Sequence, residues 1–148
     1  MSKVLVAGAI LWPLLLGATL WRHAAHDAPW WTMGVDAVAS AICHRLPDRS
    51  FHTAGAQWPV CARCSGLYLA APIGALAAVT AAGRRRVGEA RRLRWTLAIA
   101  ALPTSVTLGL EWLHLAAPSN LVRAAAALPL GAALAFAIVR VTQNDRVH

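Results

Sequence analysis

The chain has 148 residues, of which 58% are hydrophobic and only 14% are charged. This balance excludes an ordinary soluble domain and is typical of a membrane protein. The formal net charge of +8 would also suit nucleic-acid binding, but no nucleic-acid motif and no polar face accompany the basic residues. We therefore expect contact with a lipid bilayer and no binding of nucleic acid.

Four long apolar stretches lie along the chain, each interrupted by at most one ionisable side chain. As helices rising about 1.5 Å per residue they reach about 24–30 Å, close to the roughly 30 Å hydrocarbon core of a bilayer. Helices are favoured there because every backbone polar group needs an internal partner. The predicted fold class is all-α: a polytopic four-helix transmembrane bundle forming one membrane domain over residues 1–148, with an uncleaved first span. The spans are predicted at residues 4–21, 65–82, 95–114 and 124–139.

The connection between the second and third spans, residues 83–94, predicts the orientation of the bundle. Its arginine cluster favours the cytoplasmic side of the membrane. With four spans, both termini then lie in the cytoplasm, and the long loop of residues 22–64 lies outside. We expect a multi-pass protein of the cell inner (cytoplasmic) membrane. The clustered residues are Arg84, Arg85, Arg86, Arg91, Arg92 and Arg94.

Small residues recur at every fourth position in the second and fourth spans, so each set lies on one helix face. Such stripes let helix backbones approach closely within lipid. They predict close helix packing at these faces and no functional site. The stripes are Gly66, Ala70, Gly74 and Ala78 in the second span, and Ala127, Gly131 and Ala135 in the fourth.

The loop of residues 22–64 is too long for a simple connection, and it holds all three cysteines. Trp30 and Trp31, followed by the apolar residues 35–46, predict a short helix at the membrane interface. Pro47 ends that segment. Any chemistry is expected in the rest of this loop.

Two blocks and a weaker tail carry the informative residues. The first block contains Cys43-His44, Pro47, Arg49-Ser50-Phe51, Gly55 and Pro59; the second contains Cys61-Ala62-Arg63-Cys64, Gly66 and Tyr68; the tail contains Ser119-Asn120, Arg123 and Gly131. Together they resemble the domain-of-unknown-function family 2085, small predicted membrane proteins of bacteria and archaea, over residues 42–135. The tail departs from that pattern at Glu111-Trp112 and Ala126-Ala127. The resemblance implies the fold and a membrane location, and it implies no reaction.

Three thiols and an imidazole predict a four-coordinate Cys3His metal site, and zinc is the metal that such donors favour. Cys61 and Cys64 have the spacing usual for a pair of zinc ligands. Cys43 is the expected third ligand, and His44 the fourth. Because adjacent side chains tend to diverge, two other donors of the loop are alternatives for the fourth position: His52 and Asp48.

A redox pair is the rival hypothesis for the same cysteines. An outward-facing loop meets an oxidising compartment, where Cys61 and Cys64 could close a disulfide. A helix N-terminus with Arg63 beside it would also lower a thiol pKa and favour disulfide exchange. A membrane thiol-disulfide oxidoreductase is therefore one alternative; an accessory subunit of a membrane complex and a purely structural site are others. The residues identify no reaction, so whether the protein is an enzyme stays open.

Polar residues near the outer ends of the spans predict a pocket beneath the loop. Glu111 lies within the third span, where an ionisable group is usually paired or functional, and Arg123 is its expected partner. The loop arginines would suit an anion, although ion pairs with Asp36 and Asp48 explain them equally. The residues name no ligand, and a membrane-protein partner and a homo-oligomer both stay open. The predicted cluster is Arg45, Arg49, Ser50, Arg63, Glu111, Asn120 and Arg123.

Overall fold

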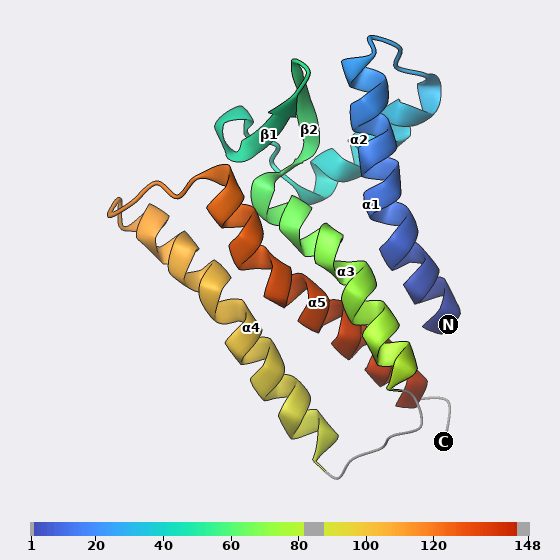
Figure 1. The fold of residues 1–148 in the computed structure, drawn as a ribbon, viewed down its shortest axis with the longest axis vertical. Coiled ribbons are helices and arrows are strands. Elements are labelled where there is room, and N and C mark those ends of the chain that lie inside the picture. The colour runs from blue at the N-terminus through green and yellow to red at the C-terminus, as the bar shows by residue number, and fades with distance from the viewer. Residues whose placement is uncertain (1, 82–87, 145–148) are drawn as a thin grey trace.

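The computed structural model describes residues 2–81 and 88–144 (Figure 1). Four long helices run roughly alongside one another, and a short helix and a two-stranded hairpin cover one end of them. The helices are α1 (Ser2–Ala24), α2 (Trp30–Ile42), α3 (Ala62–Thr80), α4 (Glu89–Trp112) and α5 (Asn120–Asn144); a 3-10 turn, η1 (Pro47–Arg49), leads into strands β1 (Ser50–Thr53) and β2 (Ala56–Cys61).

Within the described residues, four helices are long and apolar enough to cross a membrane: α1, α3, α4 and α5. This confirms the predicted spans in number and order. Helices α1 and α5 extend beyond both predicted limits, whereas α3 and α4 begin three and six residues earlier than predicted and each ends two residues earlier. The short helix predicted after Trp30 also forms, as α2.

The hairpin shows that the all-α prediction is only partly right. Strands β1 and β2 pair antiparallel, with His52 opposite Gln57 and Thr53 opposite Ala56. The turn residues Ala54 and Gly55 both have positive φ, 50° and 77°, as a two-residue hairpin turn requires. The strands have too few residues for an alternating pattern to identify them in the sequence.

The two ends of the bundle differ in what they carry. The start of α1 and the end of α5 lie at one end, which we call the termini end (Figure 1). The hairpin and α2 lie at the opposite end, which we call the loop end. Arg91, Arg92 and Arg94 belong to the first turns of α4 at the termini end, whereas Arg84, Arg85 and Arg86 lie outside the described residues.

The centre of the bundle is the contact between α3 and α5, where the small-residue stripes of both helices lie. Gly66, Ala70, Gly74 and Ala78 are all buried, as are Ala127 and Gly131 on the facing helix, while Ala135 is half-buried. The backbones touch so closely that a Cβ on Gly66 would clash with the carbonyl of Ala124, and one on Gly74 would clash with that of Ala132. The prediction of close backbone packing is confirmed.

Helix α1 and the loop end share a small apolar core. Leu16 of α1 packs with Val35 and Ala39 of α2, with Cys43 and with Val60 of β2. This cluster fixes α2 across the end of the bundle. It therefore brings the end of α2, where Cys43 lies, next to the junction of β2 and α3.

Helix α4 is held mainly by polar contacts. Only 6% of the apolar 18-residue stretch of α4 is buried, against 39% of the corresponding stretches of α3 and of α5. Helix α4 packs chiefly on α5. Midway along it, the Thr104 hydroxyl donates a 2.8 Å hydrogen bond to the carbonyl of Ala126 on α5. Its two ends are attached by carboxylates, Glu89 at the termini end and Glu111 at the loop end.

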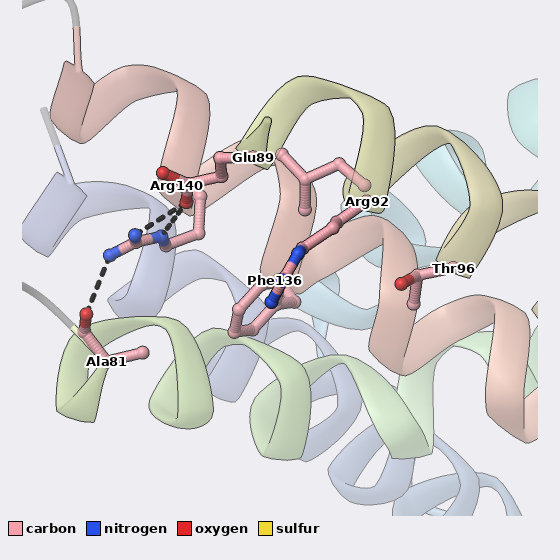
Figure 2. Close-up of a pocket in the computed structure, with 7 residues that line it drawn as sticks. Ala81, Glu89, Arg92, Thr96, Phe136 and Arg140 are labelled. Atoms are coloured by element: carbon pink, nitrogen blue, oxygen red, sulfur yellow. Dashed lines mark hydrogen bonds and ion pairs between the residues drawn. The ribbon is translucent and has the colours of Figure 1, made fainter. Parts of the chain in front are cut away.

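The attachment at the termini end was not predicted from the sequence (Figure 2). Arg140 of α5 donates from Nε to Glu89 at 2.6 Å and from Nη1 to the carbonyl of Ala81, at the end of α3, at 2.8 Å. Arg140 is buried, and together with Glu89 it lines a cavity of about 280 Å³. One guanidinium thus joins the ends of three helices.

The close contact between α3 and α5 predicts a strong effect from one added methyl group. Gly74→Ala forces the two backbones apart, and we expect it to lower the free energy of unfolding by about 1–3 kcal/mol, as overpacking does. Thermal unfolding in mild detergent, followed by circular dichroism, measures this. Gly17→Ala is the matched control, because nothing lies within 4 Å of a Cβ there; equal melting temperatures for the two variants would contradict the packing described.

Candidate functional site

The CxxC pair is positioned by the junction of β2 and α3. Cys61 is the last residue of β2 and the N-cap of α3, so Cys64 lies in the first turn of that helix. Residues three apart in a helical turn lie on the same side. The Ser65 hydroxyl donates to the carbonyl of Cys61 at 3.1 Å, which holds the junction in place.

The third cysteine reaches the pair from the end of α2. Cys43 is buried, and its backbone N–H donates to the carbonyl of Ala39. Its sulfur accepts a hydrogen bond from the backbone N–H of Cys61 at 3.1 Å. The Sγ atoms of Cys43, Cys61 and Cys64 lie within 4.8 Å of one another, close enough to hold a metal ion. We call these residues the thiol triad.

The thiol triad favours a thiolate at one position. All three cysteines are free thiols. The hydrogen bond from the Cys64 side chain, with smaller contributions from the backbone of Cys64 and from the Cys43 side chain, outweighs burial and lowers the pKa of Cys61 to about 5. At neutral pH Cys61 is therefore the anionic member, and a thiolate is the form that binds metals.

The predicted fourth donors lie apart from the thiol triad. His44, His52 and Asp48 are all exposed, and none belongs to the group of donors that the structure gathers. Of the three, only His44 lines the same cavity as the cysteines. The structure thus assembles three of the four predicted ligands.

A cavity of about 360 Å³ opens beside the thiol triad. All three cysteines line it, and so do the guanidinium-bearing side chains of Arg45, Arg49, Arg63 and Arg123. The described residues of its lining include no aspartate or glutamate. The cavity therefore combines soft sulfur donors with strong positive charge.

Glu111 is the carboxylate that holds these arginines together. Its Oε1 accepts hydrogen bonds from Arg123 Nε at 2.7 Å and from Arg63 Nη2 at 2.9 Å, and its Oε2 accepts one from Arg63 Nη1 at 3.3 Å. Arg49 Nη1 lies 3.8 Å from Oε2. The predicted pairing of Glu111 with Arg123 is observed, and we call these four residues the Glu111 cluster.

The other predicted polar residues join the hairpin to this cluster. Asn120 accepts from Arg123 Nη1 at 2.7 Å and donates to the backbone carbonyl of Ser50 at 2.9 Å. Ser50 is buried, and its hydroxyl bonds the carbonyl of Leu46. Arg45 instead pairs with Asp36 at 3.1 Å, as the sequence suggested.

Comparison with known proteins places the chain in a family. A family model described as "Predicted membrane protein (DUF2085)" matches residues 43–137. The chain belongs to this family. The DUF2085 match begins at Cys43 and includes the whole thiol triad and the Glu111 cluster. Together with its four apolar helices, membership of DUF2085 makes this a membrane-associated protein.

The relatives of this DUF2085 chain carry no assigned activity. An uncharacterized protein of Methanothermobacter thermautotrophicus is 57% identical over 30 residues, which are 20% of this chain and 27% of that protein. An uncharacterized protein of Methanocaldococcus jannaschii is 32% identical over 74 residues, 48% of this chain and 47% of that protein. The chain thus spans less than half the length of either relative. No solved structure matches it significantly.

Loss of the central carboxylate tests the Glu111 cluster. Glu111→Gln leaves the guanidiniums of Arg63 and Arg123 without their counter-charge while they remain mostly buried. We expect it to lower the free energy of unfolding by about 3–5 kcal/mol. Denaturation in detergent is the measurement. Asp27→Asn, which breaks the exposed Arg22–Asp27 pair, should cost less than about 1 kcal/mol; similar losses in both variants would refute a central role for Glu111.

Proposed function

We propose that this protein binds one zinc ion through the thiolates of Cys43, Cys61 and Cys64 at the loop end of its bundle. The convergence of the three Sγ atoms within 4.8 Å carries the proposal. Zinc–sulfur bonds of about 2.3 Å in tetrahedral geometry need sulfurs about 3.8 Å apart. Small side-chain rotations therefore suffice to close the site. Three soft thiolates favour zinc over hard cations such as magnesium or calcium.

The surroundings of the thiols support a charged metal centre. Zinc with three thiolates carries one net negative charge, which the guanidiniums of Arg49 and Arg63 can offset from the same cavity. The Cys61 N–H bond to the Cys43 sulfur stabilises a thiolate in the same way. Both features favour bound thiolates over neutral thiols.

The fourth coordination position distinguishes a structural site from a reactive one. Structural zinc sites use four protein ligands, whereas catalytic sites leave one position for water or substrate. Because the cavity reaches the thiols, we propose that this position faces the cavity. Ligation by the exposed His44, the Cys3His site expected from the sequence, is the competing assignment.

One observation favours a thiol-disulfide oxidoreductase as the second candidate function. The lowered pKa of Cys61 in a CxxC at a helix N-terminus is what disulfide exchange uses. The position of Cys43 argues for the metal, since a redox pair needs two sulfurs and here a third lies within the same 4.8 Å. The experiment below separates the two functions.

Elemental analysis tests the metal site. We expect one zinc per chain in protein purified in mild detergent without metal-affinity resin. Cys43→Ser should reduce the bound zinc to less than about a tenth of the wild-type content, because a site with two thiolates binds far more weakly. His44→Ala should keep its zinc if the fourth position faces the cavity, and His52→Ala is the matched control.

One result would decide against zinc binding, and another would decide against a fourth position that faces the cavity. A wild-type protein without metal that has a Cys61–Cys64 disulfide and one free thiol would support the oxidoreductase. Loss of zinc in His44→Ala, with retention in His52→Ala, would close the site as Cys3His.

We also propose that the loop end faces outward and that both termini are cytoplasmic, in the inner membrane. Support comes from the arginines at the start of α4, which lie at the same end of the bundle as the start of α1 and the end of α5. A C-terminal green fluorescent protein should then fluoresce, and alkaline phosphatase fused there should be inactive. Phosphatase inserted at the hairpin turn, at Gly55, should be active; the reverse pattern would invert the orientation.

A further inference from the structure

Positive charge exceeds negative charge around the cavity. Three guanidiniums, of Arg49, Arg63 and Arg123, share the single carboxylate of Glu111. Arg45 is the fourth basic side chain of the lining, and Asp36 already neutralises it. The N-termini of α3 and α5 also lie side by side here (Figure 1), and each adds partial positive charge. Even with a zinc–thiolate centre of one negative charge, the cavity carries a surplus of one positive charge.

Two of the guanidiniums have hydrogen-bonding capacity beyond Glu111. The Nε of Arg63 is buried and has no hydrogen-bond partner among the described residues. Arg49 is held only loosely, at 3.8 Å from the carboxylate, and its side chain is 44% exposed. A ligand in the cavity would therefore meet donors of Arg49 that the protein itself does not satisfy, beside the positive charge of Arg63.

We infer that this cavity binds one small oxyanion, a carboxylate or a phosphate, between Arg49 and Arg63 and beside the thiol triad. Guanidinium groups pair with such oxygens through charge-assisted hydrogen bonds. One negative charge balances the surplus, and its oxygens accept hydrogen bonds from the loosely held Arg49. The inference deepens the proposed function, because its placement of the oxyanion beside the metal rests on zinc binding.

The rim of the cavity allows two sources for the oxyanion. Ile42 and Leu46 line it and are exposed, so an acyl chain could extend over them from a headgroup in the cavity. A free phosphate or carboxylate needs only the guanidiniums. Inorganic phosphate and a short-chain phosphatidic acid distinguish these sources.

Phosphorus NMR on cobalt-loaded protein in detergent tests the inference. Cobalt(II) replaces zinc and gives a visible thiolate absorption that reports metal loading, and it accelerates relaxation of a nearby phosphorus nucleus. We expect saturable relaxation enhancement of inorganic phosphate, at least about tenfold weaker affinity in Arg49→Gln, and partial recovery in Arg49→Lys. Arg22→Gln is the matched control, because Arg22 pairs with Asp27 and does not line the cavity.

The outcomes separate the two proposals. Acetate, followed by proton NMR in the same way, represents the carboxylates. Cobalt binding without binding of phosphate or acetate overturns the oxyanion site and leaves the metal site intact. If the protein takes up no cobalt, phosphate binding is followed by broadening of the phosphorus line alone. Binding that then depends on Arg49 refutes the metal site and supports the anion site. Equal phosphate affinity in Arg49→Gln and Arg22→Gln overturns the inference. Tighter binding of phosphatidic acid than of phosphate supports the site and identifies a lipid headgroup as its ligand.

Discussion

The pairing of one carboxylate with three guanidiniums is the constraint on which the loop end depends. Arg63 and Arg123 lie at the N-termini of α3 and α5, and Glu111 lies at the C-terminus of α4. Each charge has the sign that its helix dipole disfavours, so each is tolerable there mainly because of the others. Through Asn120, the same cluster reaches the backbone of Ser50 and so the hairpin. Proteins break local rules of this kind mostly where function requires it, which agrees with a ligand site at this end.

The opposite end of α4 is arranged differently. Glu89 begins α4 and Arg140 lies near the end of α5, so both charges have the sign that the helix dipole favours. This pair attaches α4 to α5, and Arg140 also donates to a carbonyl at the end of α3. Between the two ends α4 buries little surface and has the Thr104 hydrogen bond. Helix α4 is thus held mainly at its two ends, and its side away from α5 is free to contact lipid.

The features that the sequence predicted correctly are those set by residues close together in the chain. Apolar length predicted the spans, and the spacing of small residues predicted the closely packed faces of α3 and α5, because both follow from helix geometry. The Arg140–Glu89 pair joins residues 51 positions apart, and no local pattern indicates such a partner. His44 failed to join the cysteines because the backbone at Cys43 is extended, with φ −143° and ψ 131°. Neighbouring side chains in extended backbone point to opposite sides, so a buried Cys43 leaves His44 exposed.

The contact between Cys43 and Cys61 closes the segment between them into a loop whose base is fixed in the protein. Closing a loop costs entropy only slowly as its length increases, and the turn at Ala54 and Gly55 is exposed and far from that base. Extra residues at this tip would lengthen the loop without moving either cysteine. The hairpin tip is therefore the position where a tag, an epitope or a crystallisation partner can be inserted with the least disturbance to the bundle.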